Sequence, residues 1–137
     1  MNVVIEQTFP SLTWAIRQEA MYPGKDLEAV KLDDDFNGIH FGLYVNHALT
    51  GVVSLFIDQD RAQFRKLAVL PHMQRKGLGN LIIQNLISFC KTEKLSKIWC
   101  NARVDAIGFY EKNGFVTSGE PFSRNHLQYI KMELLLG

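Results

Sequence analysis

Residues 76–93 carry the clearest helical pattern in the chain, and they follow a strand-like segment that Pro71 stops. Apolar residues recur there at spacings of three and four, with Gln84, Ser88 and Lys91 on the opposite face. Those apolar residues are Leu78, Leu81, Ile82, Leu86, Phe89 and Cys90. The pattern predicts an amphipathic helix that covers the strand-rich remainder of the chain with one face.

The other segments alternate between strand-like and helix-like patterns. Strands are expected at residues 2–7, 39–45, 50–58, 63–70, 97–102 and 127–136, and helices at 10–21, 76–93 and 105–114. Ser11 is expected to cap the first helix, and the acidic segment 31–38 is expected to be a loop or short turn that is mostly solvated. Because there is no repeat or linker, we expect one α/β domain over residues 1–137, with helices against a mixed sheet.

Composition limits the classes of function. The net charge of the 137 residues is +1, which is far from the basic balance of a typical nucleic-acid-binding protein. The N-terminus lacks a basic region followed by an apolar core, so no signal peptide is expected. The longest apolar stretch, 78–90, is too short and too polar to span a membrane. We therefore expect a cytoplasmic protein with neither a nucleic-acid nor a membrane partner.

Cys90 and Cys100 are the only two cysteines, and they form no Cys-x-x-Cys pair. Two cysteines at this spacing build neither a disulfide framework nor a zinc site. Each lies in an apolar segment, so we expect buried, unreactive thiols and no metal.

The segment "HMQRKGLGNL", residues 72–81, lies between a strand and the start of the long helix and holds two glycines one residue apart. A Walker loop needs Gly-Lys followed by Ser or Thr, and no such tripeptide occurs. A Rossmann fingerprint needs glycine at the sixth place of G-x-G-x-x-G, where this chain has Ile82. What remains is the pattern Q/R-x-x-G-x-G over residues 74–79.

The physical chemistry of this segment favours an anion. A helix N-terminus presents unpaired amide groups and a partial positive charge. Gly77 and Gly79 would let a pyrophosphate approach the backbone closely, and Arg75 and Lys76 add two full charges. The alternative is a glycine-rich turn with solvated basic side chains.

Together with this loop, the downstream segments "IWCNA" and "GFYEKNGF" resemble the second half of the GCN5-related N-acetyltransferase (GNAT) family. The resemblance is strongest over residues 63–116. It implies the GNAT fold, an α/β fold with a mixed, mostly antiparallel, splayed sheet of six to seven strands flanked by helices. It also implies acetyl-CoA as co-substrate, with no metal, and direct transfer of the acetyl group to an amine.

By this resemblance, the cofactor contacts of the family fall on matching positions of the chain. The pantetheine arm would lie against the backbone of Leu67, Ala68 and Val69, with the Leu67 N–H as the donor to the thioester carbonyl. Asn101 would lie where the sheet splays. The pyrophosphate would be cradled by Gln74, Arg75, Lys76, Gly77, Leu78, Gly79 and Asn80.

A narrower likeness, to the glyphosate N-acetyltransferase group, comes from "IWCNAR", "GFYEKNGF", "GEPF" and "IRQEAMYPG". That group recognises small amino-phosphonates or amino-carboxylates with a cluster of arginines. By this resemblance, Arg17, Arg65 and Arg103, together with His40, would line the site of a small anionic amine. A guanidinium suits such a ligand because it donates two parallel hydrogen bonds to a carboxylate or phosphonate.

Acetyl transfer needs a base that frees the amine lone pair and an acid that protonates the departing thiolate. Tyr110, in "GFYEKNGF", matches the family tyrosine placed at the sulfur. The resembled group has its histidine base three residues before a methionine of the last strand, where this chain has Tyr129. A phenol, with a reference pKa of about 10, is a weak base at neutral pH. His126 could replace it only if the chain there is irregular, so the base stays open among Tyr129, His126, His40 and a chain of waters.

Other acceptors and another class of protein also stay open. An uncharged amine, a polyamine or a protein amine could be the acceptor, and the acidic "KLDDD" at residues 31–35 is a modest hint of this. The rival from another class is a non-catalytic acyl-CoA-binding module. We expect a small-molecule amine as the partner, and a homodimer is one possible oligomeric state.

Overall fold

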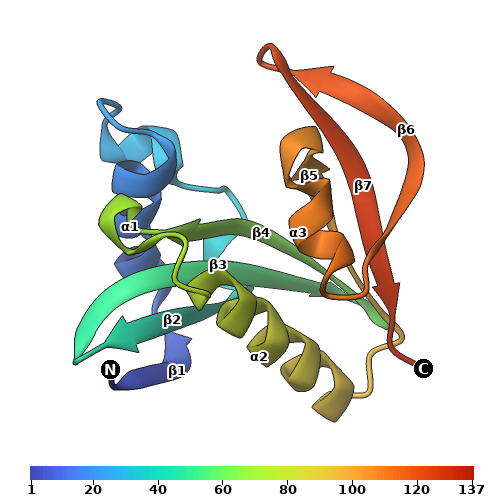
Figure 1. The fold of residues 1–137 in the computed structure, drawn as a ribbon, viewed down its shortest axis with the longest axis horizontal. Coiled ribbons are helices and arrows are strands. Elements are labelled where there is room, and N and C mark those ends of the chain that lie inside the picture. The colour runs from blue at the N-terminus through green and yellow to red at the C-terminus, as the bar shows by residue number, and fades with distance from the viewer.

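The computed structural model describes residues 1–137 as a seven-stranded sheet flanked by helices (Figure 1). The strands are β1 (Val3–Thr8), β2 (Ile39–Val45), β3 (Ala48–Asp58), β4 (Arg61–Val69), β5 (Lys97–Arg103), β6 (Val116–Arg124) and β7 (Leu127–Leu135). The α-helices are α1 (Pro10–Met21), α2 (Leu78–Thr92) and α3 (Ile107–Glu111), and two 3-10 turns, η1 (Leu27–Val30) and η2 (Asp35–Asn37), follow α1. Every strand and helix expected from the sequence is present, with ends that differ by a few residues.

The order of strands in the sheet is β1-β2-β3-β4-β5-β7-β6. All neighbouring strands are antiparallel except β4 and β5, which are parallel. Figure 1 shows α2 crossing below β3 and β4, while β6 and β7 rise away from them beside α3. The expected fold class, a mixed and mostly antiparallel α/β sheet with helices beside it, is confirmed.

β4 and β5 pair at one end only. Parallel bridges join Arg61–Gln63 to Lys97–Trp99, and no bridge follows along the rest of the two strands. Further along β4, the register against β3 shifts and Lys66 has a positive φ of 58°. Irregularities of this kind re-aim main-chain groups and often lie next to active sites. The backbone at residues 66–69 therefore borders an opening between β4 and β5, which we call the splay.

The main core lies between α2 and the sheet. From α2 it takes the buried residues Leu78, Ile82, Ile83, Leu86, Ile87 and Cys90. Leu81, which the sequence pattern places in the apolar stripe, is 43% exposed, because the buried face is centred near Ile82 and Ile83 and Leu81 points away from it. No helix is long and apolar enough to cross a membrane.

The N-terminal region differs from expectation at two points. α1 begins at Pro10, with Phe9 at the cap position, so the predicted Ser11 cap is wrong. Proline suits the first helical position because it has no amide hydrogen to leave unpaired. The acidic segment 31–38 is a short turn in which only one residue is buried, as expected, but that residue, Asp35 of η2, is a completely buried carboxylate.

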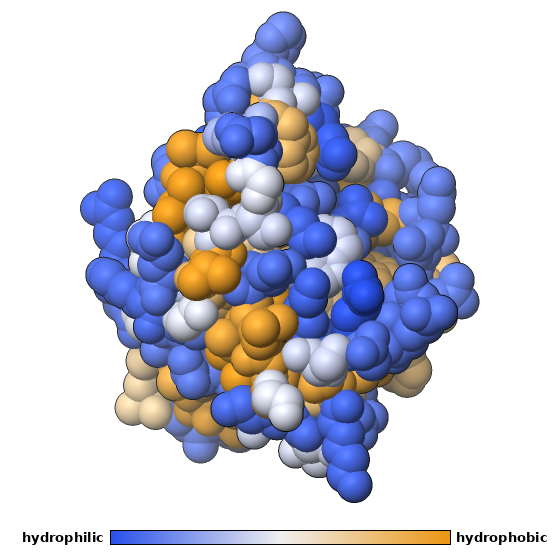
Figure 2. Space-filling model, turned by 90° about the vertical axis from the view of Figure 1, so that its right-hand side faces the viewer, coloured by the Kyte–Doolittle hydropathy of each residue, from blue (hydrophilic) through white to orange (hydrophobic).

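β6, an edge strand, has no counterpart among the strands expected from the sequence. Most of its side chains are exposed, so buried and exposed residues do not alternate along it. Gly119 and Pro121 interrupt it, and its register with β7 shifts between Ser118 and Phe122. Such irregularity is tolerated at a sheet edge because one side of the strand has no partner. Figure 2, which views this side, shows hydrophobic patches within a mostly hydrophilic surface.

Candidate active site

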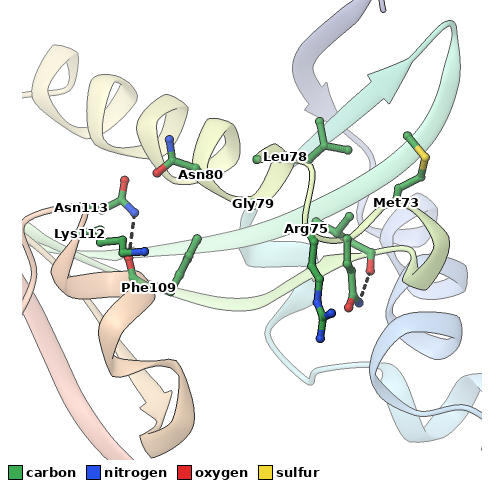
Figure 3. A pocket seen from close by; sticks show the side chains of 11 residues that line it. Met73, Arg75, Leu78, Gly79, Asn80, Phe109, Lys112 and Asn113 are labelled. Carbon is green, nitrogen blue, oxygen red and sulfur yellow. Dashed lines mark hydrogen bonds between the residues drawn. The ribbon is translucent and has the colours of Figure 1, made fainter.

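A cavity of about 500 Å³ lies between the start of α2 and α3. Figure 3 shows the first turn of α2 on one side of it and, on the other, Phe109 of α3 with Lys112 and Asn113, which directly follow α3. Most of the residues predicted from the sequence to bind the cofactor line this cavity: Val69, Gln74, Arg75, Gly77, Leu78, Gly79 and Asn80. The structure therefore brings the predicted pyrophosphate loop together around one hollow.

The loop before α2 leaves main-chain amides and positive charge at this cavity. Gly77 has a φ of 82°, and a Cβ there would meet no atom within 4 Å, so glycine is needed for the backbone conformation. The first turn of α2 has neither an acidic side chain nor a side-chain cap, so its amides stay free. Arg75 and Lys112 add two cations. These features fit a bound pyrophosphate.

Two amide side chains hold the walls of the cavity. Gln74 Nε2 donates a hydrogen bond of 2.9 Å to the carbonyl of Val69, which ties the loop to the end of β4. On the other wall, Asn113 Nδ2 donates to the Phe109 carbonyl at 3.0 Å, and Asn113 Oδ1 accepts from Gln84 Nε2 of α2 at 2.6 Å. The relative position of α2 and α3 is thus fixed by Asn113.

Phe109, Lys112 and Asn113 line the cavity without having been predicted. All three lie in the segment "GFYEKNGF", where the resemblance assigned a role to Tyr110 alone. They lie at positions i, i+3 and i+4, which places them on the same face of a helical turn. This spacing is the signal from which the sequence could have predicted them together.

Five predicted cofactor residues lie outside the cavity: Leu67, Ala68, Lys76, Asn101 and Tyr110. Leu67 packs against the main core, and Ala68 is 4% exposed in a small apolar cluster with Ile16 of α1. Asn101 lies on β5 beyond the last bridge to β4, and Lys76 is exposed in the loop. Leu67, Ala68 and Asn101 therefore border the splay.

Tyr110 of α3 is buried among aromatic rings. Its ring centroid lies 5.8 Å from that of Phe64, 5.0 Å from Phe109 and 5.8 Å from Phe115. Burial, with a smaller contribution from Cys100, raises the pKa of its hydroxyl well above the usual value. The side chain is therefore a neutral phenol near pH 7.

Arg17 was predicted to contact the acceptor, and that prediction is wrong. Its side chain has no exposed surface and forms a bidentate ion pair with Asp35, with both distances 2.9 Å. The guanidinium also donates to the Val30 carbonyl at 2.9 Å and to the Ser54 hydroxyl at 2.8 Å. Only its Nε lacks a partner, and that atom is buried. A buried cation needs such partners, and they leave none of it for a ligand.

His40 is only 2% exposed, so its predicted roles as an acceptor contact and as a candidate base are wrong as well. Its Nδ1 lies 2.7 Å from Ser54 Oγ, and its Nε2 lies 2.7 Å from the carbonyl oxygen of Asp35. Because a carbonyl only accepts, Nε2 carries the proton, and the Ser54 hydroxyl donates to Nδ1. Burial lowers the pKa of His40, with Asp35 opposing the effect, so the ring is neutral near pH 7.

Asp35 is the centre of these contacts. Besides Arg17, its carboxylate accepts hydrogen bonds of 3.0 Å from Trp14 Nε1 and from the Leu32 amide. Burial alone would raise its pKa, but the hydrogen bonds from Arg17, Leu32 and Trp14 and the charge of Arg17 outweigh burial and lower the pKa to about 2. These contacts tie residues 26–38 to α1 and to β3. We call the set the buried network: Trp14, Arg17, Asp35, His40 and Ser54.

Arg65 and Arg103 remain available for an acceptor. Arg65 is half-buried on β4, opposite Ser54 of β3, and takes part in no ion pair or side-chain hydrogen bond. Arg103, at the end of β5, is exposed and pairs with Asp105 at 3.2 Å. Both alternate with residues buried under α2 and α3, so they lie on the opposite face of the sheet, which α1 also occupies.

The two candidate bases lie at different depths. Tyr129 is half-buried on β7, opposite Arg103 of β5, and its ring is stacked on Phe122 with centroids 5.8 Å apart. His126 is exposed in the turn between β6 and β7, with a φ of 67°. A role for His126 as the base requires an irregular backbone at this residue, and the backbone is irregular there. However, the residue lies at the exposed tip of the β6–β7 hairpin.

Lys131 of β7 adds a third cation to this face, and it was not predicted. It lies opposite Asn101 of β5, with its Nζ 4.7 Å from the centroid of the Trp99 ring. The Glu133 carboxylate is 4.0 Å from Lys131 and 3.2 Å from Lys97, so one anion faces two cations. The alternation of "LQYIKMELLL" places Lys131 and Tyr129 on one face, which is the signal that could have found it. We call Arg65, Arg103 and Lys131 the acceptor-face cations.

Both cysteines are buried, as predicted. Burial raises the pKa of Cys90 to about 11, with Glu93 contributing, and that of Cys100 to about 12. Both are therefore neutral thiols with little nucleophilic character. The structure brings no three metal-ligating side chains together.

Comparisons with known proteins agree with this geometry. A family model described as "Acetyltransferase (GNAT) domain" matches residues 22–136. Over 119 residues the chain is 25% identical to the uncharacterized N-acetyltransferase YitI of Bacillus subtilis (strain 168), covering 80% of each chain.

Solved structures of acetyltransferases share the fold. The ribosomal-protein-S18-alanine N-acetyltransferase from Escherichia coli has a TM-score of 0.81 at 21% identity, covering 98% of this chain and 94% of that one. A GNAT family acetyltransferase from Elizabethkingia anophelis with acetyl-CoA bound has a TM-score of 0.73 at 18% identity, covering 98% and 96%. The match over residues 22–136 shows that the chain belongs to the GNAT family, and it is an acetyl-CoA-dependent N-acetyltransferase.

Proposed function

We propose that this enzyme acetylates the amine of a small molecule that also carries a carboxylate, phosphonate or phosphate group. The observation that carries the proposal is Arg65, a half-buried cation beside the splay with no ion pair or side-chain hydrogen bond inside the protein. Removing part of a cation from water without a partner is unfavourable, and an anionic ligand would compensate for it. Arg103 and Lys131 lie on the same face and increase the positive charge there.

On the other side of the splay, we propose that the cofactor pyrophosphate binds at the start of α2. The free amides of the first turn, together with Arg75 and Lys112, support this assignment. The pantetheine arm would then run between β4 and β5, where their bridges end after Gln63 and Trp99. The cofactor would approach from the α2 side, and the acceptor would approach from the α1 side.

The chain's own groups can serve each step of the transfer. Acetyl-CoA supplies the acetyl group as a thioester. We assign to Tyr129, in its phenolate form, the acceptance of the proton that the acceptor ammonium loses, because it lies beside Arg103, whereas His126 lies at an exposed tip. As the C–N bond forms and the C–S bond breaks, the Leu67 N–H donates to the carbonyl oxygen. Tyr110 then donates its proton to the departing sulfur. The nitrogen loses its second excess proton to solvent as the amide forms, and solvent then returns a proton to Tyr110 and takes one from Tyr129.

A protein amine is the second candidate acceptor. It is favoured by the fold shared with the ribosomal-protein-S18-alanine N-acetyltransferase from Escherichia coli. The narrower likeness to the glyphosate N-acetyltransferase group assigned four residues to the acceptor site. Two of them, Arg17 and His40, are buried in the buried network and do not contact an acceptor. We therefore propose the class of anionic amines and no single member of it. A homodimer and a cytoplasmic location stay predictions.

The acceptor class can be tested by following CoA thiol release with matched amines. The panel would pair free amino acids and aminoalkylphosphonates with their neutral amides or esters. We expect kcat/KM to be at least about tenfold higher for the charged member of a pair, equivalent to about 1.4 kcal/mol. Arg65→Ala should remove most of this preference, and Lys91→Ala, which removes an exposed cation at the end of α2, should not. Equal kcat/KM values for the charged and neutral members of a pair would contradict the proposal. A higher kcat/KM for peptides that carry no charge near the amine would contradict it as well.

A further inference from the structure

A second cavity, of about 440 Å³, lies on the sheet face opposite α2. It is formed where β3 ends and where β4 and β5 begin. Its walls include Asp34 and Asn37 from the segment around η2, Phe56 and Asp58 from β3, Gln63 from β4 and Trp99 from β5. We call it the distal cavity.

The distal cavity adjoins the acceptor-face cations. Gln63 lies two residues before Arg65 on β4, and Trp99 lies two residues before Asn101 on β5, so each pair shares one face of its strand. Two residues of a strand span about 7 Å. Lys131 Nζ is 4.7 Å from the centroid of the Trp99 ring, which lines the cavity. An acceptor bound beside Arg65 would therefore reach the distal cavity with a side chain of about 7 Å.

The lining of the distal cavity is rich in hydrogen-bond acceptors. Asp34 and Asp58 make no ion pair and no side-chain hydrogen bond, and Asn37 and Gln63 add two amide oxygens. Arg61 also lines the cavity, but its guanidinium lies 4.0 Å from the carboxylate of Asp60, which does not line it. Such a lining suits a group that donates hydrogen bonds.

Two aromatic side chains restrict further which chemical group the distal cavity can bind. Phe56 and Trp99 both line the distal cavity, and aromatic faces attract flat or cationic groups. A guanidinium combines the required features because it is planar, positively charged and made only of donors.

The wall that carries Asp34 and Asn37 is held in place from behind. Asp35 lies between them in the sequence, and its carboxylate is fixed by Arg17, by Trp14 and by the Leu32 amide. When the wall of a cavity is already ordered, ligand binding costs little free energy for ordering that wall. The buried network thus explains why this side of the cavity is preformed.

We propose that the distal cavity binds the far end of the acceptor, and that this end carries a guanidinium or a similarly flat, donor-rich cation. The inference rests on the proposed function, because it places the anionic group of the same acceptor beside Arg65. It adds a second specificity element about 7 Å away.

The test uses four acceptors that share an α-amine and a carboxylate and differ at the far end: L-arginine, L-citrulline, L-norvaline and L-glutamate. We expect kcat/KM to fall in that order, with L-arginine at least about tenfold above L-norvaline, since hydrogen bonds to a charged group are worth this much or more. Asp58→Asn and Asp34→Asn should each bring L-arginine to within a fewfold of L-norvaline without changing the rate with L-norvaline. Asp33→Asn, an exposed neighbour outside the cavity, is the matched control and should keep the preference.

Each outcome bears on a different claim. Equal rates with L-arginine and L-norvaline, or a preference that survives both Asp34→Asn and Asp58→Asn, would overturn the assignment of the distal cavity and leave the proposed function intact. Equal rates with L-arginine and its amide would instead contradict the proposed function, because that pair varies the carboxylate and not the far end. No acetylation of any of the four amines would overturn both.

Discussion

The two sides of the splay are built from different parts of the chain. On the α2 side, one continuous segment, residues 73–80, forms a cavity wall in which main-chain amides and a glycine conformation matter most. On the α1 side, polar side chains from separate strands and turns meet, and they divide into the acceptor-face cations and the buried network. A main-chain site depends on backbone conformation, whereas a side-chain site depends on which charges stay exposed. On the α1 side, an arginine-to-alanine substitution should therefore lower stability at the buried Arg17 and weaken acceptor binding at the unpaired Arg65.

The largest effect is expected from Arg17→Ala. It leaves the Asp35 carboxylate buried without its counter-charge, which typically costs about 3–5 kcal/mol of unfolding free energy. Arg103→Ala is the control, because that ion pair is exposed, with side-chain exposures of 52% and 71%, and should cost about 1 kcal/mol or less. Urea unfolding followed by circular dichroism measures both. Similar small losses would show that Arg17 does not hold residues 26–38.

Gly77→Val tests the α2 side. A β-branched residue at a φ of 82° should distort the loop, and we expect acetyl-CoA affinity to fall by at least about 10²-fold, equivalent to about 2.7 kcal/mol. Gly24→Val is the matched control, since Gly24 has a φ of 85° and also no neighbour within 4 Å of a Cβ, but lies in the turn after α1. Titration calorimetry with acetyl-CoA compares the two. Wild-type affinity in Gly77→Val would place the cofactor elsewhere.

Tyr110→Phe separates chemistry from binding. The ring keeps its contacts with Phe64 and Phe115, so the fold and both KM values should change little. The thiolate loses its proton donor, so kcat should fall by about 10²-fold. Steady-state thiol release gives both constants, with Tyr44→Phe on β2 as a control. An unchanged kcat would mean that another group protonates the sulfur.

The smallest effect is a pH dependence of stability. The folded pKa of His40 lies below the ordinary value of 6.5, so the stability linked to it is present above pH 6.5 and is lost as pH falls below that value. Asp35, lowered to about 2 from 3.8, should add a second loss between pH 3.8 and about 2. His40→Gln should flatten the first decline, whereas His47→Gln, at an exposed site, should leave it unchanged. A decline below pH 6.5 that persists in His40→Gln would assign it to another group.

The cofactor side and the fold were predictable because their signals are local. The glycine spacing, Pro71 and the helical stripe after residue 77 lie within one short segment, and they predict a strand, a loop and a helix in that order. Runs rich in β-branched, aromatic and other apolar residues likewise predict β2, β3 and β7 closely.

The acceptor side was less predictable, because whether a charged side chain is exposed there depends on ion pairs between residues far apart in the sequence. The helical pattern of α1 does not reveal that Arg17 meets Asp35, 18 residues away in an acidic segment that reads as solvated. Because Asp35 is buried, its counter-charge Arg17 must be buried with it. Arg17 also donates to the Ser54 hydroxyl, which in turn contacts His40, so His40 is buried in the same network. β6 was hidden for a different reason, since an exposed edge strand has no apolar alternation to detect.

The central claim is that the cofactor binds on the α2 side of the splay and the acceptor binds on the α1 side. The most direct test is to measure both KM values, for acetyl-CoA and for an anionic amine, in Gly77→Val and in Arg65→Ala. The structure predicts a crossed result, in which Gly77→Val raises the KM for acetyl-CoA by at least about 10²-fold and Arg65→Ala raises the acceptor KM by about tenfold, each with little effect on the other constant. A rise of the same KM in both variants would contradict the division of the splay into two sides.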